Sequence, residues 1–163
     1  MTNYFTSLMS FFSSIENPLT LMFTSAFLSA TLLPGNSEII FSALISQALQ
    51  IENGSFYRQI IPLFISATLG NSLGSLTTYT FARLIPQPQF EKTPNKIARW
   101  ALHHSKKYGI WILLFSWLPI VGDLFCGIAG WLRFNVWHSL IFITLGKAIR
   151  YAVLLWGIYS LLG

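Results

Sequence analysis

The stretch from Gln59 to Ala82 holds 24 residues without one charged side chain. At about 1.5 Å per residue, a helix of this length spans the roughly 30 Å hydrocarbon core of a bilayer. Only 9% of the 163 residues are charged and 53% are apolar, whereas about a quarter of a soluble domain is charged. The composition therefore excludes a soluble globular fold and predicts a single membrane domain over residues 1–163.

The positive charge is concentrated in one loop. Residues 83–107 hold six basic side chains and one acidic one, which accounts for the whole net charge of +5. Short loops rich in Lys and Arg stay on the cytoplasmic side of a membrane. We therefore place this loop in the cytoplasm, interpret its charge as a topology signal, and expect no nucleic-acid partner.

The hydrophobic sequence divides into segments of two kinds. Gln59–Ala82 and Asn135–Leu162 are continuous and long enough to cross the membrane. Two others are interrupted: residues 17–51 by Pro34-Gly35-Asn36, and residues 108–132 by Pro119 and Gly122-Asp123. Each arm of residues 108–132 has about half the length that crossing requires. We expect both interrupted segments to be re-entrant helical hairpins, which enter and leave the membrane on the same side.

An internal repeat relates the two halves of the chain. Residues 33–38 (LPGNSE) correspond to residues 118–123 (LPIVGD), and residues 68–71 (TLGN) to residues 144–147 (TLGK). One hairpin plus one crossing makes an odd number of passes, so the second copy would insert upside down relative to the first. The expected fold is thus an all-α integral membrane protein built as an inverted repeat, with both termini outside. Its expected parts are repeat one over about 17–82, a cytoplasmic basic amphipathic helix over about 93–107 and repeat two over about 108–162.

The expected basic helix starts at Thr93-Pro94, where a cap residue precedes a proline. Ile97, Trp100 and Ala101 would form its apolar face, and the basic side chains would lie on another face. This pattern is typical of a helix that lies on the cytoplasmic leaflet and meets anionic head groups. The alternative is a solvated basic loop.

Four charged residues fall within the hydrophobic segments: Glu38, Asp123, Lys147 and Arg150. Each costs about 2.5 to 3.5 kcal/mol at the bilayer centre, so we expect them to be paired or solvated. Lys147 and Arg150 share one helix face at i and i+3. The cluster is either a pair of structural salt bridges or a site where the two cations hold an anionic head group and the two acids exchange protons.

Further residues are expected to support this site. Pro34, Asn36 and Pro119 lie at the hairpin tips, where broken helices direct backbone dipoles toward it. Gly70 and Gly74 predict a close helix contact, and Asn71 and Ser72 are expected to hydrogen-bond across it to a hairpin.

The sequence holds no pattern typical of an enzyme. It has one cysteine, Cys126, and the pair His103-His104 lacks any accompanying ligand cluster. We therefore expect no metal, no cofactor and no enzymatic activity.

Several segments together resemble the DedA superfamily, also called SNARE-associated or VTT-domain proteins, and most closely its small YqaA-like branch. They are residues 29–38 (SATLLPGNSE), 70–74 (GNSLG), 116–123 (SWLPIVGD), 129–131 (AGW) and 146–151 (GKAIRY). The resemblance implies a bacterial inner-membrane protein with two opposed re-entrant hairpins. It also implies flipping of polyprenyl phosphates or other phospholipids, dependent on the proton gradient.

The resemblance places Glu38 at the first-hairpin acid of the family and matches Pro119, Ala129 and Gly130 to its second-hairpin pattern. The chain also departs from the family. Arginines that members commonly carry around the second-hairpin proline are replaced here by Ser116 and Gly122, and Asp123 is added.

The function expected from the sequence is a secondary transporter or flippase for an anionic lipid such as undecaprenyl phosphate, coupled to protons. The alternative is a non-transporting scaffold or envelope-homeostasis protein whose buried charges are structural. The sequence is compatible with a homo-oligomer and leaves open the lipid, the direction of transport, the coupling ion and the oligomeric state.

Overall fold

A computed structural model describes residues 17–31, 36–50, 56–86 and 96–162 of the chain. Every regular element in these ranges is helical, which confirms the all-α expectation. The elements are α2 (Pro18–Thr31), α3 (Asn36–Gln50), α4 (Phe56–Leu84), α6 (Lys96–Tyr108), the 3-10 helix η1 (Gly109–Trp117), α7 (Val121–Trp131) and α8 (Val136–Leu162).

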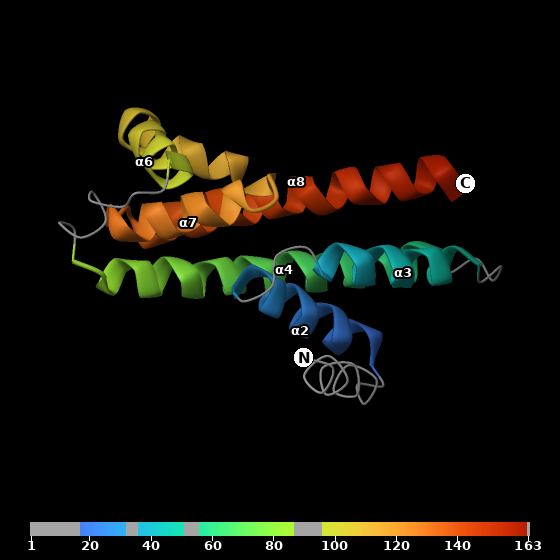
Figure 1. Ribbon diagram of the computed structural model, residues 1–163. Helices are drawn as coiled ribbons and strands as arrows, with labels where there is room; N and C mark the ends of the chain where they lie inside the picture. The colour runs from blue at the N-terminus through green and yellow to red at the C-terminus, as the bar shows by residue number, and fades with distance from the viewer. Residues whose placement is uncertain (1–16, 32–35, 51–55, 87–95, 163) are drawn as a thin grey trace, which may run out of the picture.

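The two longest helices, α4 and α8, run antiparallel along the molecule (Figure 1). Within them, the stretches Arg58–Leu84 and Val136–Leu161 have 27 and 26 residues, and an 18-residue window in each has a mean hydropathy of 1.3 and 1.5, respectively. Each stretch is about 40 Å long, which exceeds the roughly 30 Å hydrocarbon core. These helices contain the two predicted crossings, and both have the length and composition to span a membrane.

The remaining helices of the membrane segments are too short to cross and pack in pairs against the long ones. Helix α2 packs along α4 and also contacts α3, while η1 packs along α8 and also contacts α7. The second member of each pair reaches across the molecule: α3 contacts α8, and α7 contacts α4. The two pairs are therefore joined to both long helices.

The break in the second predicted hairpin is shorter than the sequence suggested. Helix α7 already begins at Val121, so Gly122 and Asp123 lie in its first turn and only residues 118–120 interrupt the helices. Gly122 fits there because a Cβ would lie 2.5 Å from the carbonyl oxygen of Ser116. The tip of the first predicted hairpin, with Pro34, lies outside the described residues.

A tight turn at Ile120 joins η1 to α7. Its φ is 65° and its ψ is −59°, and the amide of Val121 donates a 2.7 Å hydrogen bond to the carbonyl oxygen of Pro119. This is a γ-turn with positive φ, a strained conformation that β-branched residues rarely adopt. The chain thus reverses within three residues directly before Asp123.

Glycines bring the short helices into backbone contact with the long ones. A Cβ at Gly70 of α4 would clash with the carbonyl oxygen of Phe23 in α2, and one at Gly74 with that of Phe27. The predicted close contact at these two glycines is therefore present. On the other long helix, a Cβ at Gly146 of α8 would clash with Ser116 of η1.

Two apolar clusters form the core, one toward each end of the long helices. One is built around Met22, Phe41 and Ile45, and the other around Leu113, Phe125 and Ile128. Along α4, the first cluster ends at Ala67 and the second begins near Tyr79. The residues between them include Asn71 and Ser75, both buried and polar. A polar layer therefore separates the two clusters.

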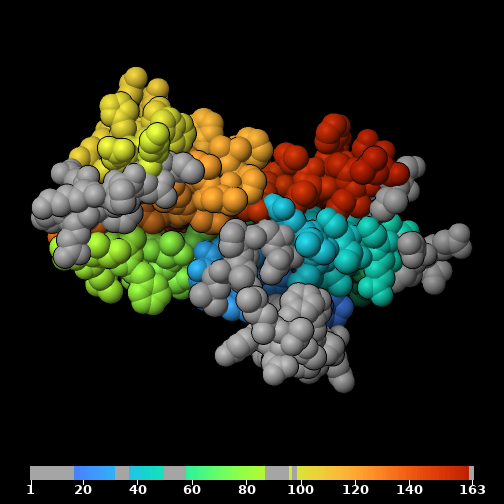
Figure 2. Space-filling model, in the orientation of Figure 1, coloured from blue at the N-terminus to red at the C-terminus, as the bar shows by residue number. Residues whose placement is uncertain are grey.

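Helix α6 lies at the opposite end of the molecule from the C terminus (Figures 1 and 2). It packs on α7 and η1 through Ala101, Leu102 and Ser105, which are all buried. The predicted apolar face is only partly the packed face, because Ala101 is buried whereas Trp100 is half exposed. Thr93-Pro94, the predicted helix start, lies outside the described residues, as does the side chain of Ile97.

Candidate functional site

Two cations are buried in the polar layer, both on α8. Apart from Lys147 and Arg150, this 27-residue helix carries no Lys, Arg, Asp or Glu. The Lys147 side chain is 0% exposed and the Arg150 side chain 7%. A buried unpaired cation would cost several kcal/mol, so the surroundings must supply anions.

Asp123 of α7 supplies the anion for Lys147. The lysine Nζ donates a 2.6 Å hydrogen bond to Asp123 Oδ1, and the Ser75 hydroxyl donates a 3.0 Å bond to the same oxygen. The carboxylate is 21% exposed, unlike the lysine. Because Ser75 belongs to α4, this single carboxylate oxygen joins α4, α7 and α8.

Glu38 of α3 supplies the anion for Arg150. Arg150 Nε donates a 2.7 Å hydrogen bond to Glu38 Oε1, and Nη2 also donates to that oxygen. The glutamate side chain is 33% exposed. In this pair too, the acid is more accessible than the base.

Both acids occupy the same place in their helices. Glu38 is the third residue of α3 and Asp123 the third residue of α7. The N-terminus of a helix carries a partial positive charge, which stabilises a carboxylate. Each acid is therefore held between a helix N-terminus and a cation of α8.

Uncharged polar groups connect the Glu38 side of the layer to α4. Asn71 Nδ2 donates to the Tyr151 hydroxyl at 3.0 Å and to Ser29 Oγ at 3.4 Å. The hydroxyls of Tyr151 and Ser29 in turn donate to Ser37 Oγ, at 3.2 and 2.8 Å. The sequence prediction that Asn71 bonds across to the first short helix pair agrees with this geometry.

Several site residues were missed by sequence reasoning. Ser29, Ser37, Ser75 and Tyr151 were not proposed, although Ser37 precedes Glu38 and Tyr151 lies one turn after Lys147. The sequence signal that could have found such residues is a polar side chain that lies close to a charged residue, or one helical turn from it, within a hydrophobic segment. Ser and Tyr are common in apolar helices, which makes this signal weak.

The predicted supporting residues have different outcomes. Asn71 lies in the hydrogen-bonded layer, and Pro119 lies exposed in the γ-turn, where its carbonyl accepts the bond from Val121. Asn36 begins α3, but its side chain, like all of Pro34, lies outside the described residues.

The polar layer has unused hydrogen-bonding capacity. Asn71 Oδ1, Thr68 Oγ1 and Ser72 Oγ are buried and have no hydrogen-bond partner within the described part of the chain. The bond predicted for Ser72 is therefore absent there. A buried unpaired polar atom costs about 1 to 3 kcal/mol, so these atoms favour an additional polar group in the layer.

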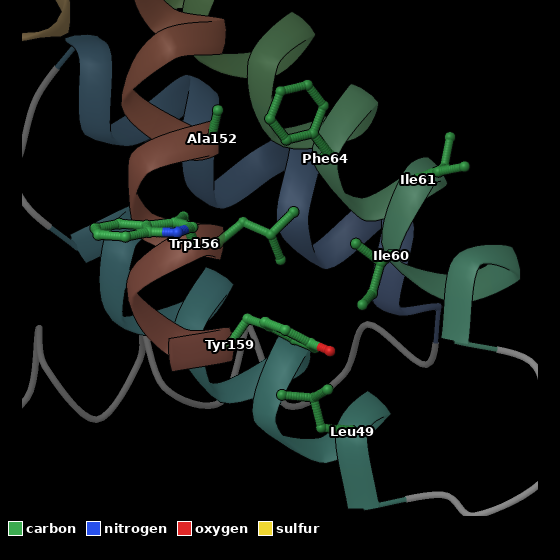
Figure 3. Close-up of a pocket in the computed structure, with 8 residues that line it drawn as sticks. Leu49, Ile60, Ile61, Phe64, Ala152, Trp156 and Tyr159 are labelled. Atoms are coloured by element: carbon green, nitrogen blue, oxygen red, sulfur yellow. The ribbon is translucent and has the colours of Figure 1, made fainter. Parts of the chain in front are cut away.

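An apolar groove of about 940 Å³ opens between the C-terminal half of α8, the N-terminal half of α4 and the end of α3 (Figure 3). Its lining carries no charged side chain and is formed by Leu49, Ile60, Ile61, Phe64, Ala152, Leu155, Trp156 and Tyr159. The volume lies in the range of small-molecule sites. Among the residues that the structure places, no three His, Cys, Asp or Glu side chains gather in a way that could hold a metal.

Comparisons with known proteins identify the family. The family model described as "VTT domain" matches residues 40–160, which is most of the chain. The chain belongs to the VTT-domain family. The matched range includes Asp123, Lys147 and Arg150 and begins two residues after Glu38.

Individual relatives agree with this family. The chain is 53% identical over 150 residues to an uncharacterized protein of Haemophilus influenzae, with 90% of this chain and 92% of that protein covered. It is 41% identical over 130 residues to "Inner membrane protein YqaA" of Escherichia coli, covering 80% of this chain and 83% of the relative. The Shigella flexneri protein of the same name gives the same values. No solved structure matches the chain.

The resemblance to the DedA and VTT family is thus confirmed. Close relatives are named as inner-membrane proteins, and α4 and α8 are long and apolar enough to span a bilayer. This VTT-domain chain is therefore a multi-pass inner-membrane protein.

Proposed function

We propose that the chain is a secondary transporter or flippase for an anionic lipid, such as a polyprenyl phosphate, and that proton uptake drives it. The observation that carries this proposal is the pairing of two buried cations on α8 with two more accessible carboxylates at the N-termini of α3 and α7. We also propose that the chain is not an enzyme.

The exposure difference within each pair suggests an order of events. A proton can reach the carboxylates of Asp123 and Glu38 because both are partly exposed, whereas the cations that they balance are buried. Protonation removes the anion that balances Lys147 or Arg150, and the freed cation then attracts a phosphate. Arg150 can bind phosphate as a fork, and Lys147 as a point charge.

The packing also supports a two-fold inverted repeat of re-entrant hairpins. Gly70 and Gly146, which occupy equivalent places in the repeated Thr-Leu-Gly motif, each receive the first short helix of their own half. The residues that follow them, Asn71 and Lys147, both bond into the polar layer. Rocking one repeat against the other would alternate the access to that layer.

The apolar groove supports a lipid rather than a soluble anion as substrate. It begins near Ala152, two residues after Arg150, and continues along α8 to Tyr159. An uncharged groove on membrane-spanning helices is best suited to bind a hydrocarbon chain.

A scaffold with structural ion pairs is the second candidate. The observation that favours it is that each of the four charges already has a protein partner. Exchanging the partners, with Asp123→Lys and Lys147→Asp together, separates the two candidates. A scaffold tolerates the exchange, whereas a site for a phosphate loses lipid binding because the cation moves to another helix.

The proposal is tested first by binding. Purified protein in detergent is mixed with undecaprenyl phosphate or with phosphatidylglycerol, and complexes are counted by native mass spectrometry in acidic and neutral buffer. We expect undecaprenyl phosphate to bind in a pH-dependent way that Arg150→Ala abolishes and that Arg58→Gln, a change of an exposed cation on α4, leaves intact. Equal binding by wild type and Arg150→Ala would overturn the assigned site.

A further inference from the structure

Aromatic side chains of three elements surround a second groove, of about 500 Å³, at the α6 end of the molecule. Its lining includes no member of the ion pairs, and it plays no part in the proposed transport cycle. Its walls include Trp100, His104 and Tyr108 of α6, Trp111 and Phe115 of η1, and Phe125 of α7.

The rings on the α6 side hold one another in place. The centroid of the Trp100 ring lies 4.3 Å from that of His104 and 5.9 Å from that of Phe125. His104 Nδ1 lies 2.8 Å from the carbonyl oxygen of Trp100. Because a carbonyl only accepts hydrogen bonds, Nδ1 carries the hydrogen, and this bond fixes the orientation of the His104 ring on α6.

A basic rim borders this groove. Lys96, His103 and Lys107 are exposed and lie four residues before, three after and seven after Trp100, which places them on its side of the helix. Lys107 Nζ lies 5.3 Å from the centroid of the Tyr108 ring. No acidic residue occurs between Lys96 and Tyr108, so the rim is purely cationic or neutral.

The groove faces outward. The packed face of α6, through Ala101 and Ser105, lies on the other side of the helix. The groove walls Trp111 and Phe115 of η1 are 64% and 53% exposed. Exposed aromatic rings beside a cationic helix are typical of the boundary between membrane and cytoplasm.

We propose that this groove binds one anionic phospholipid of the leaflet that α6 faces, predicted to be the cytoplasmic one. A hydrocarbon chain lies along Trp111 and Phe115, and the phosphate lies at the rim, near Lys107. A free phosphate would gain nothing from the aromatic walls, and an uncharged lipid would gain nothing from the rim. The combination therefore selects an anionic lipid.

The full-length protein in detergent is titrated with phosphatidylglycerol and with phosphatidylcholine of the same chains, and bound lipid is counted by native mass spectrometry. Each surface cation contributes about 1 kcal/mol to binding an anionic lipid, or about fivefold. We expect one phosphatidylglycerol to bind at least about fivefold more tightly than phosphatidylcholine. Inorganic phosphate in excess should not displace it.

Matched variants locate the binding. Lys96→Gln with Lys107→Gln, and separately Trp111→Ala, should each lower the affinity at least about fivefold. The charge-matched control is Arg58→Gln with Arg133→Gln, which changes two exposed cations outside α6. Trp137→Ala, a change of an exposed tryptophan of α8, is the aromatic control.

Three results would overturn the proposal. Equal affinity for the two lipids would show that the basic rim does not select the lipid. An equal loss of affinity in the control variants would show that the binding depends only on general surface charge. Displacement of bound lipid by an acidic peptide, with phosphatidylglycerol binding unchanged in Trp111→Ala, would assign the groove to a protein partner instead.

Discussion

Lys147 Nζ lies 2.6 Å from Asp123 Oδ1, and this contact joins the middle of a membrane-crossing helix to the first turn of a short one. The lysine has no exposed surface, whereas the carboxylate is partly exposed. Such a pair is poorly explained as a source of stability alone, since buried ion pairs gain little over apolar packing. It is well suited to a site whose charge balance changes when a proton or an anion arrives.

Removing one member of this pair should destabilise the fold. Asp123→Asn leaves Lys147 buried without an anion, and we expect a loss of about 3 to 5 kcal/mol in the free energy of unfolding. Thermal unfolding of the purified protein in detergent measures the effect. A variant as stable as wild type would mean that water or another group already balances the lysine.

Neutralising both members should restore most of that stability. In Asp123→Asn with Lys147→Gln neither member of this pair is charged, and the two amide side chains can still hydrogen-bond. We expect the double variant to unfold within about 1 to 2 kcal/mol of wild type. If it is no more stable than Asp123→Asn alone, the two residues are not energetically coupled.

Gly70→Ala should disrupt the contact between α2 and α4. The added methyl group would clash with the backbone carbonyl of Phe23, and we expect a loss of about 1 to 3 kcal/mol. Gly157→Ala is the matched control, because nothing lies within 4 Å of its Cβ position in α8. The control should be neutral or more stable by up to about 1 kcal/mol, and similar unfolding temperatures for both variants would contradict the packing.

Tyr151→Phe should weaken the polar layer without opening the apolar core. The change removes the acceptor for Asn71 Nδ2 and the donor to Ser37, and we expect a cost of about 1 to 2 kcal/mol. Tyr108→Phe, at an exposed tyrosine of α6, serves as the control. An unchanged unfolding temperature in Tyr151→Phe would show that these hydrogen bonds contribute no net stability.

The proposed re-entrant arrangement predicts which positions share a side of the membrane. In a Cys126→Ala background, one cysteine at a time replaces Lys107, Asn135, Arg58 or Leu161. Lys107 and Asn135 flank the segment of η1 and α7. Arg58 lies near the start of α4, and Leu161 lies near the end of α8. A membrane-impermeant maleimide applied to spheroplasts should label positions 58 and 161 only. Labelling of just one of positions 107 and 135 would mean that the intervening segment crosses the membrane.

The sequence predicts the long helices well because their signal is local. A charge-free run between two charged flanks marks α4 in any apolar environment, and the structure extends it by only a few residues. The four charged residues of the site are equally visible in the sequence, since each is out of place in a hydrophobic segment. The positions of charged residues along the sequence therefore locate the helices that carry the candidate site.

The sequence does not predict which charges pair. Lys147 and Arg150 share a helix face, and either could reach either acid until the positions of α3 and α7 are known. The packed face of α6 was predicted only in part, because Ala101 is buried but Trp100 is half exposed, and Ser105, which is buried, was not assigned to that face. The γ-turn at Ile120 was not foreseen, because a β-branched residue gives no local signal for positive φ. These features depend on tertiary packing.

The central claim is that the ion pairs serve transport and are more than structural links. Vesicles containing purified protein and a fluorescent polyprenyl phosphate, with a pH gradient across the membrane, measure flipping as the loss of signal to an impermeant quencher. The account predicts rapid flipping by wild type and none by Asp123→Asn with Lys147→Gln, provided that the double variant is folded. Wild-type flipping by the folded double variant would contradict the account.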